Sequence, residues 1–320
     1  MVLIALATLY ILWGSTYLAI RIGIETLPPL LMASTRFFLA GLLMFGWAWN
    51  RGHLRDGGAP TRRHWLATLV IGGLLLGGGN GGVTWGEQFV ASGVAALLVA
   101  TVPVWMALLA HLLRQERLSW LVGAGLALGI GGVVLVAHPW SGSVGQLKGV
   151  VAVLFAALAW SSGSLYARRA RLPRSAIVVT AMEMLCGGAV LLVAATVNGE
   201  LGRVHPEHFS VRSILAVLYL VVFGSIIAFS AYVYLLNHVS AALAGTYAFV
   251  NPAVAVLLGA LVLHEPLSPA VVVGGAVIIA GVALVVAGRS VDSRAARRAV
   301  TVSSAQSLRG SSAGVTPPSR

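Results

Sequence analysis

Two charged side chains lie deep inside long apolar stretches of this 320-residue sequence, and a charge in such a place suggests chemistry. Glu183 stands in the otherwise uncharged run from Ser175 to Asn198, and Arg36 stands in the apolar run that follows Pro29. Each lies about seven residues, or ~10 Å, from the start of its segment if the segment is helical. An ionisable residue inside a membrane segment usually serves a substrate, a proton pathway or an opposite charge. We therefore interpret Glu183 and Arg36 as coupling or gating residues.

The alternative for these two residues is structural. The two charges could form an ion pair, or Arg36 could extend toward the membrane surface. Burial among apolar groups favours the neutral form of a carboxyl group, so Glu183 is a candidate site for taking up and releasing a proton. If Arg36 reaches Glu183, the carboxylate stays ionised and the pair becomes structural. The predicted partners are accordingly a small-molecule substrate, a proton and the lipid bilayer.

Aromatic, hydroxyl and amide side chains inside the apolar stretches are suited to a cavity for a small, partly apolar molecule. Trp and Tyr also gather at membrane interfaces, which is the competing interpretation. Asn80 lies within the glycine-rich run over residues 77–82. Such a run permits close helix approach or local unwinding. The candidate substrate-binding residues are Trp13, Ser15, Tyr17, Asn80, Trp85, Thr101, Trp160, Glu183, Tyr232, Tyr247 and Asn251.

Two prolines lie within apolar segments, Pro103 and Pro252. Proline removes a backbone hydrogen bond and kinks a helix, and in a bilayer the freed carbonyl must face protein or a wet cavity. A kink at this depth fits a gate or a cavity wall, with a simple packing kink as the alternative. We therefore add both prolines to the coupling and gating candidates.

The remaining reactive side chains favour structural roles. Glu116 and Glu265 each precede Leu-Ser at the end of an apolar segment, so we expect them to cap the turn and helix that follow. His111 and His264 have no partners at metal-ligand spacing. The lone Cys186 excludes an intramolecular disulfide. We expect no catalytic site, no metal and no cofactor, and hence no enzyme.

Composition indicates the class of protein that must position these residues. Hydrophobic residues make up 58% and charged residues 9%, whereas a soluble domain has about 25% charged residues. A spanning helix needs roughly 20 apolar residues. The sequence predicts an all-α polytopic membrane protein with ten transmembrane helices, over residues 3–24, 30–49, 65–86, 91–113, 119–137, 148–167, 176–197, 213–236, 240–263 and 269–288.

The basic residues predict how the chain is oriented in the membrane. With the N-terminus in the cytoplasm, 16 Lys and Arg residues lie in inside loops and the tail, and 3 lie in outside loops. Such a bias places both termini in the cytoplasm of a multi-pass inner-membrane protein. We therefore interpret the net charge of +12 as a signal that orients the chain in the membrane. No nucleic acid is expected as a partner. Arg21, near a helix end, is expected to anchor that end at the interface.

The chain also repeats itself. Residues 103–136 and 252–285 align without a gap at a shift of 149, with 15 of 34 positions identical, among them Pro103/Pro252 and Gly125/Gly274. Earlier in the chain Trp13 matches Trp160 at a shift of 147, where Arg36 falls opposite Glu183. Five helices per copy is an odd number, so the two copies must cross the membrane in opposite senses. Inverted repeats of this kind are common in secondary transporters.

Several motifs resemble the drug/metabolite transporter superfamily and its EamA-like exporters. They are Leu12-Trp13-Gly14-Ser15-Thr16-Tyr17 with Arg21 and Gly23, Arg36-Phe37, Ala100-Thr101-Val102-Pro103 with Glu116-Arg117-Leu118-Ser119, and Val250-Asn251-Pro252 with His264-Glu265-Pro266-Leu267-Ser268. The resemblance implies ten helices in two inverted five-helix repeats, a central cavity, alternating access, and export of metabolites, amino acids or drugs. We expect one repeat over 1–140, a second over 141–288, and a disordered basic cytoplasmic tail over 289–320.

Two alternatives to export stay open. One is a facilitator or exchanger that imports a metabolite, and the other is a membrane scaffold or receptor. The motifs identify neither the substrate nor the coupling ion, and the oligomeric state is also open.

Overall fold

All regular secondary structure in the described part of the chain is helical. The computed structural model describes residues 1–56, 59–114, 119–137, 143–239 and 246–288, and it contains no strand within them. In these ranges nine helical segments are long and apolar enough to cross a membrane, and α14 is a shorter apolar helix. The predicted all-α membrane class is confirmed. Glu116 and the predicted tail over 289–320 lie outside the described residues.

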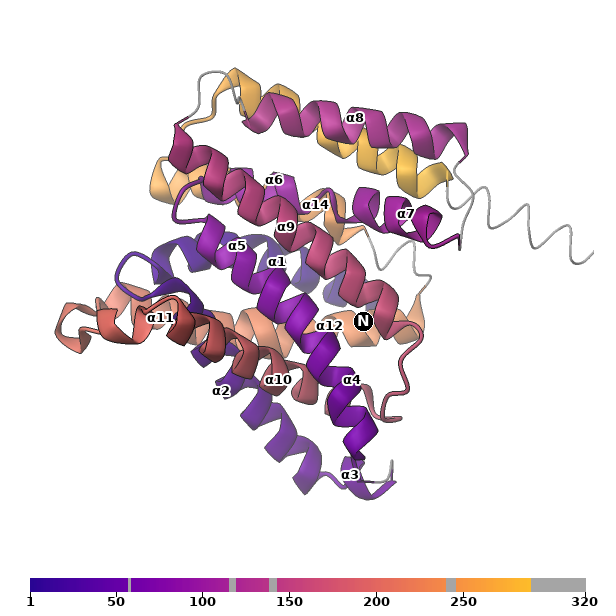
Figure 1. Cartoon of the computed structure of the whole chain (residues 1–320), viewed down its shortest axis with the longest axis vertical. Helices are drawn as coiled ribbons and strands as arrows, with labels where there is room; N and C mark the ends of the chain where they lie inside the picture. Colours follow the sequence, from indigo (N-terminus) through magenta and orange to yellow (C-terminus); the bar gives the residue numbers. More distant parts are fainter. Residues whose placement is uncertain (57–58, 115–118, 138–142, 240–245, 289–320) are drawn as a thin grey trace, which may run out of the picture.

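The helical segments follow the predicted spans closely (Figure 1). Three short helices, α3 (His53–Asp56), η2 (Glu200–Arg203) and η3 (Pro206–His208), lie in loops. The long segments are α1 (Val2–Gly23), α2 (Pro29–Asn50), α4 (Arg62–Gly72) with η1 (Gly73–Asn80) and α5 (Gly81–Gly86), α6 (Ser92–Val99), α7 (Val102–Leu112), α8 (Trp120–Ala137), α9 (Val144–Ala167), α10 (Ala176–Val197), α11 (Val211–Tyr219) with η4 (Leu220–Ile227) and α12 (Ala228–His238), α14 (Tyr247–Leu263), and Pro269–Gly288.

The helix predicted over 91–113 is divided in two. Ala100 and Thr101 separate α6 from α7, and Pro103 is the second residue of α7. Proline cannot donate the backbone hydrogen bond that would continue α6, which explains a break just before it. Pro252, in contrast, lies inside α14, which continues past it. The predicted kink is therefore a helix break in one case and an internal proline in the other.

Two segments of eight residues, η1 and η4, are π-helical within otherwise α-helical spans. The glycine run over residues 77–82 spans the end of η1 and the start of α5, so the helix is widened there and is not unwound. The same glycines bring α9 very close, because a Cβ at Gly78 would lie 2.9 Å from the Ala159 side chain and one at Gly82 would lie 2.9 Å from Ala156. Close helix approach, one of the two expectations for this run, is what the structure has.

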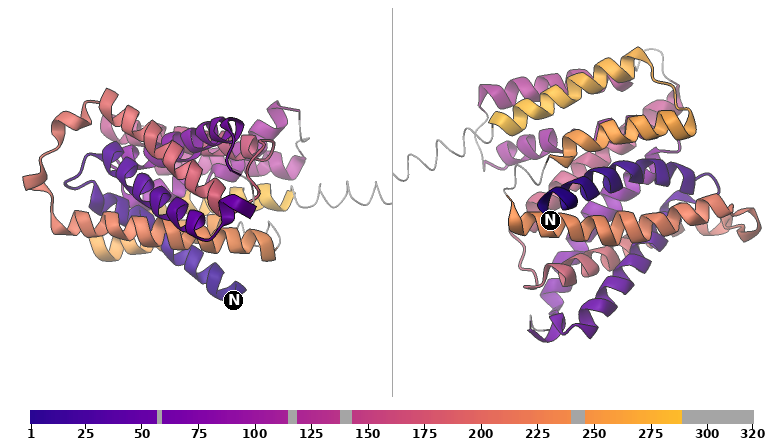
Figure 2. Two further views of the ribbon diagram at one scale, coloured as in Figure 1. Left: turned by 90° about the horizontal axis from the view of Figure 1, so that it is seen from below. Right: turned by 180° about the vertical axis from the view of Figure 1, so that it is seen from behind.

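The helices form layers with a pair of crossing helices at either end (Figures 1 and 2). α8 and Pro269–Gly288 lie side by side in one outer layer. A Cβ at Gly125 would lie 2.6 Å from the Gly281 carbonyl oxygen, and one at Gly274 would lie 3.0 Å from that of Gly132. These glycines therefore let the two backbones touch, as small residues do in membrane helix pairs.

The pair at the opposite end is α2 with α10 (Figure 1). Gly41 of α2 faces Leu185, and Gly188 of α10 faces Phe38. Ser34 adds a hydrogen bond from its hydroxyl to the Gly188 carbonyl at 2.9 Å. The spans α1, α4–η1–α5, α6, α9 and α11–η4–α12 lie between the two pairs.

Candidate functional site

The first cluster of candidate residues is held by the π-helical segment η4. Trp13 of α1 donates from its indole nitrogen to the Gly224 carbonyl at 3.2 Å. Arg36 of α2 donates from Nε to the Ser225 hydroxyl at 2.9 Å. These bonds join α1 and α2 to the middle of the α11–η4–α12 span.

Gly224 makes this approach possible. A Cβ at this position would lie 2.9 Å from the Thr16 side chain and 3.2 Å from an Arg36 guanidinium nitrogen. A side chain here would therefore push α1 and Arg36 away from η4. π-Helical turns are frequent at functional sites because they redirect backbone and side-chain groups. Ser15 joins the same span one turn earlier, through a 2.6 Å hydrogen bond to the Tyr219 hydroxyl.

Arg36 and Glu183 do not form an ion pair in the structure. Arg36 is 5% exposed, its guanidinium lies 4.7 Å from the centre of the Phe37 ring, and its described polar contact is Ser225. The ion pairs found within the described residues involve neither side chain. The structural pair, which was the alternative for these residues, is therefore absent, and each charge has its own surroundings.

Glu183 is 8% exposed within α10. No hydrogen bond to its carboxyl group is found among the described residues. A cavity of about 200 Å³ opens one turn before it, lined by Met44, Ile177, Thr180, Phe229, Ser230 and Tyr234. Residues three apart on a helix are neighbours on one face, so Thr180 and Glu183 share a face of α10. A buried carboxyl group beside a small, mostly apolar cavity is suited to proton uptake or to a polar substrate group.

The second cluster is aromatic and joins α1, α12 and α14. The ring centres of Trp13 and Tyr247 are 5.0 Å apart, those of Trp13 and Tyr232 are 5.3 Å apart, and Phe229 lies 5.8 Å from Trp13. Oriented to suit its neighbours, the Asn251 amide nitrogen donates to the Tyr247 carbonyl at 3.2 Å. The structure therefore brings together four of the predicted residues, Trp13, Tyr232, Tyr247 and Asn251.

The other predicted residues are dispersed. Thr101 is buried and donates to the Leu98 carbonyl of its own helix at 2.6 Å. Trp85 packs against Phe89 near the end of α5, with ring centres 4.9 Å apart and ring planes tilted by 56°. Tyr17 packs on the core formed by α6 and α9, while Trp160 packs against the η1 side of the molecule, near Gly79. Asn80 ends η1. The predicted set thus divides among three or more places.

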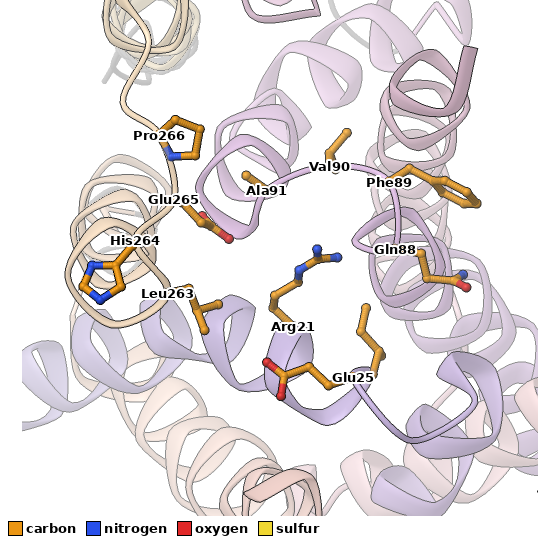
Figure 3. Close-up of a pocket in the computed structure, with 11 residues that line it drawn as sticks. Arg21, Glu25, Gln88, Phe89, Val90, Ala91, Leu263, His264, Glu265 and Pro266 are labelled. Carbon is orange, nitrogen blue, oxygen red and sulfur yellow. The ribbon is translucent and has the colours of Figure 1, made fainter. Parts of the chain in front are cut away.

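A larger cavity of about 610 Å³, here called the vestibule, opens where α1, α5 and α14 end (Figure 3). It is lined by Arg21, Ile24, Glu25, Gln88, Phe89, Val90, Ala91, Leu263, His264, Glu265 and Pro266. The Arg21 and Glu265 side chains point into the same space, whereas the His264 ring points away from it. Arg21 donates to the Glu87 carbonyl oxygen, so it fastens α1 to the end of α5.

Glu265 caps a different helix from the one expected. His264 ends α14 in the left-handed region with a φ of 53°, and the Glu265 N–H bonds back to the Gly259 carbonyl at 3.1 Å. This turn, common at helix C-termini, directs the carboxylate onto the start of α6. There it accepts from the Ser92 N–H and hydroxyl, each at 2.9 Å, and from the Gly93 N–H at 3.3 Å. The following helix is capped by Ser268 instead.

The sequence reasoning missed Glu87, Ser225 and Phe229. Glu87 stands at the polar end of an apolar span, a position typical of a solvated residue, yet it is fully buried. Ser225 and Phe229 lie in an ordinary apolar run, and only the packing of α1 and α2 on that run reveals them. The burial of Glu87 and the cap that Glu265 forms on α6 therefore could not be read from the sequence.

The sequence pattern of the EamA-like transporter family matches residues 1–137 and again residues 147–287. The chain belongs to this family. It is therefore a membrane transporter, and the resemblance carried by the Trp13, Pro103 and Pro252 motifs is confirmed. The family assignment favours a protein that is not an enzyme.

Named relatives agree with this assignment. The uncharacterized inner membrane transporter YedA of Escherichia coli K12 is 42% identical over 288 residues, which cover 89% of this chain and 90% of YedA. The uncharacterized transporter YoaV of Bacillus subtilis is 25% identical over 284 residues, covering 88% and 95%. A solved crystal structure of a protein superposes with a TM-score of 0.59 at 22% identity, covering 90% of this chain and 98% of that one, and so shares the fold.

Proposed function

We propose that this transporter exports small metabolites, amino acids or drugs across the cytoplasmic membrane by alternating access. As in the relative named as an inner membrane transporter, the location would be the inner membrane. Export would move a substrate from a cytoplasm-facing state to an outside-facing state through the region between the two crossing pairs. The observation that carries this proposal is that contacts between the two halves are reciprocal. Where a residue of the first half contacts a residue of the second, their counterparts in the repeat also contact each other.

Reciprocal contacts occur in both crossing pairs. At the shift of 147, Gly41 corresponds to Gly188 and Phe38 to Leu185, and Gly41 faces Leu185 just as Gly188 faces Phe38. At the shift of 149, the Gly125–Gly281 contact corresponds to the Gly274–Gly132 contact. Reciprocal contacts of this kind are the property of an interface with a two-fold axis.

The π-helical segments support the same symmetry. Residues 73–80 of η1 become residues 220–227 of η4 when shifted by 147. The family pattern also matches the chain twice, over ranges close to the proposed repeats 1–140 and 141–288. Since each half has five spans, a two-fold axis between them would lie in the membrane plane. Two inverted halves that rock about such an axis are a well-known basis of alternating access.

The binding region we propose is the aromatic cluster of Trp13, Tyr232 and Tyr247 with Asn251, continued by Ser15 and Arg36 on η4. Aromatic rings with a few polar groups suit small, partly apolar molecules. Arg36 would bind a negatively charged or carbonyl group, and Glu183 would carry a proton. The helix break before Pro103 and the proline inside α14 would let α7 and α14 change angle during the cycle. The dispersed candidates Tyr17, Asn80, Trp85, Thr101 and Trp160 would line the path at other stages.

A two-stage experiment tests export. The growth media of expressing cells and of cells carrying an empty vector are compared, and metabolites enriched by expression are selected. The purified protein is then placed in proteoliposomes, and exchange of each labelled metabolite against its unlabelled form is measured. We expect enrichment outside the cells and counterflow in the vesicles. Enrichment inside the cells would indicate an importer, and no counterflow for any enriched compound would overturn the proposal.

A further inference from the structure

Glu87 is a buried carboxyl group without a hydrogen-bond partner. It directly follows α5, it has no exposed surface, and neither carboxyl oxygen has a hydrogen bond within the described part of the chain. Most buried polar atoms in proteins are hydrogen-bonded, so two unpaired oxygens on one group need an explanation. An unpaired carboxylate in such a place is very costly, whereas a protonated carboxyl group is much less so.

Glu200 shows how this fold hydrogen-bonds another buried carboxyl group. Glu200 is also fully buried, but one oxygen accepts from the Leu31 N–H at 2.9 Å at the start of α2, and the other accepts from the Asn198 amide at 3.1 Å. Glu265 has three such donors at the start of α6. Glu87 has none in the described residues, so its surroundings are not built for a permanent negative charge.

The charged groups around Glu87 do not neutralise it. Arg21 of α1 bonds to its carbonyl and not to its carboxylate, and Tyr17 faces it from the same helix. Glu265 approaches from the end of α14. α9 packs along α5 and has Lys148 exposed at its start, and Arg36 of α2 is bonded to Ser225. Burial raises the pKa of the Glu87 carboxyl well above its ordinary value, the charge of Glu265 raises it further, and that of Arg21 lowers it.

Glu265 acts as a clasp between the two halves at this end of the molecule. It extends from the second half, after α14, and its carboxylate caps α6 of the first half through Ser92 and Gly93. Gly259 leaves room for it, because a Cβ there would overlap the Glu265 carboxylate. The clasp lies at the vestibule and in electrostatic contact with Glu87. A negative charge on Glu87 would therefore act directly on the clasp.

We propose that Glu87 is a proton-binding site whose loss of a proton opens the Glu265 clasp. This inference rests on the proposed alternating access and adds a site to it. In the protonated form, the neutral Glu87 stays buried and Glu265 holds α6 to α14. When the O–H bond breaks and the proton passes to water, two neighbouring carboxylates repel each other. The strain is relieved when Glu265 leaves the start of α6, so that the vestibule widens and Glu87 becomes hydrated.

Infrared spectroscopy tests proton binding directly. The full-length protein in lipid nanodiscs is measured at pH 7 for the C=O stretch of protonated carboxyl groups. We expect a band in the wild type that loses intensity in Glu87→Gln, where the buried Glu183 accounts for what is left, and that keeps its full intensity in Glu207→Gln, whose carboxyl is exposed on the η3 turn. An identical band in wild type and Glu87→Gln, or no band in the wild type, would overturn the proposal.

Thiol labelling tests the clasp. In a Cys186→Ala background, Val90→Cys reports opening, because Val90 is buried beside the vestibule, and Gln88→Cys reports an exposed neighbour. We expect the Val90→Cys rate, divided by the Gln88→Cys rate, to rise with pH by up to about tenfold per pH unit, as the ionised fraction does below a pKa. Glu87→Gln should remove this rise, and Glu87→Asp, which keeps the carboxyl, should retain it.

An unchanged pH dependence in Glu87→Gln would show that another group controls the clasp. Both measurements work without a known substrate. If they succeed while no transport is found, the proposed function alone fails. If transport is found but the infrared band and the labelling rise are absent, this inference alone fails.

Discussion

The hydrogen bond between Arg36 and Ser225 joins α2 to η4 in the interior of the molecule. A buried guanidinium that loses a partner retains the cost of its desolvation, which for a bond to a charged group is about 1.5–3 kcal/mol. We predict that Ser225→Ala lowers stability by about this amount, measured as the thermal unfolding midpoint in detergent. Ser230→Ala is the matched control, because the Ser230 hydroxyl bonds to the Ile226 carbonyl of its own helix. Equal midpoints for the two variants would show that the Arg36 contact is not stabilising.

Glu183 has no ion pair with Arg36, so its substitution should not leave Arg36 unpaired. We predict that Glu183→Gln folds normally, loses proton-driven transport, and keeps exchange of labelled for unlabelled substrate. Gln has the shape of the protonated carboxyl group but cannot release a proton. The measurements are transport driven by a pH gradient and counterflow without one, with Cys186→Ala as a control on the same helix. Normal pH-dependent transport by a well-folded Gln variant would exclude a coupling role.

At the scale of single residues, the sequence predicted part of the site. Depth in an apolar span identified Trp13, Tyr232 and Tyr247, and the structure brings these three together. Depth in a span does not show which helices are neighbours. The sequence-based prediction therefore grouped Thr101 and Trp85 with these three residues, although both lie elsewhere. Glu87 was missed for the same reason, because the charged groups that act on it, Arg21 of α1 and Glu265 after α14, are distant in the sequence.

At the scale of helices, glycine positions decide which backbones can touch. Gly125 and Gly131 both lie in α8, but a Cβ at Gly125 would lie 2.6 Å from the Gly281 carbonyl oxygen, and one at Gly131 would meet nothing within 4 Å. Gly125→Ala should therefore overpack the crossing and cost about 1–3 kcal/mol. Gly131→Ala should gain up to about 1 kcal/mol from its helix propensity.

The pair of variants forms one experiment, because the same change is made in the same helix. The thermal unfolding midpoint in detergent should fall for Gly125→Ala. It should rise or stay unchanged for Gly131→Ala. A destabilised Gly131→Ala with an unchanged Gly125→Ala would mean that α8 and Pro269–Gly288 do not cross at these glycines.

Most helices could be predicted from the sequence because twenty apolar residues in succession leave few alternatives in a bilayer. The π-helical segments could not. η1 contains most of the glycine run, but η4 reads Leu-Val-Val-Phe-Gly-Ser-Ile-Ile, which has no local sign of a changed hydrogen-bond register. The groups that bond to η4, the Trp13 indole on the Gly224 carbonyl and the Arg36 guanidinium on the Ser225 hydroxyl, come from helices distant in the sequence. The break between α6 and α7 is intermediate, because Pro103 indicated it to within three residues.

At the scale of the whole molecule, the direction of the chain in the membrane remains a prediction from charge. The 16-to-3 excess of basic residues places residues 51–63 and 168–174 in the cytoplasm and 199–212 outside. On this topology the ends of α1, α5 and α14 face outside, and so does the vestibule with Glu87. The side of the membrane to which Glu87 releases its proton therefore depends on the orientation.

Labelling from one side of the membrane decides the orientation. In a Cys186→Ala background, Ser210→Cys, at the start of α11, and Ser303→Cys, in the C-terminal segment, are exposed to an impermeant maleimide in intact spheroplasts. We predict that Ser210→Cys is labelled and that Ser303→Cys is labelled only after lysis, because a basic segment is retained on the cytoplasmic side. The opposite labelling pattern would show that the chain has the reverse orientation in the membrane. The vestibule would then open to the cytoplasm, and loss of the Glu87 proton would open the side from which an exported substrate enters.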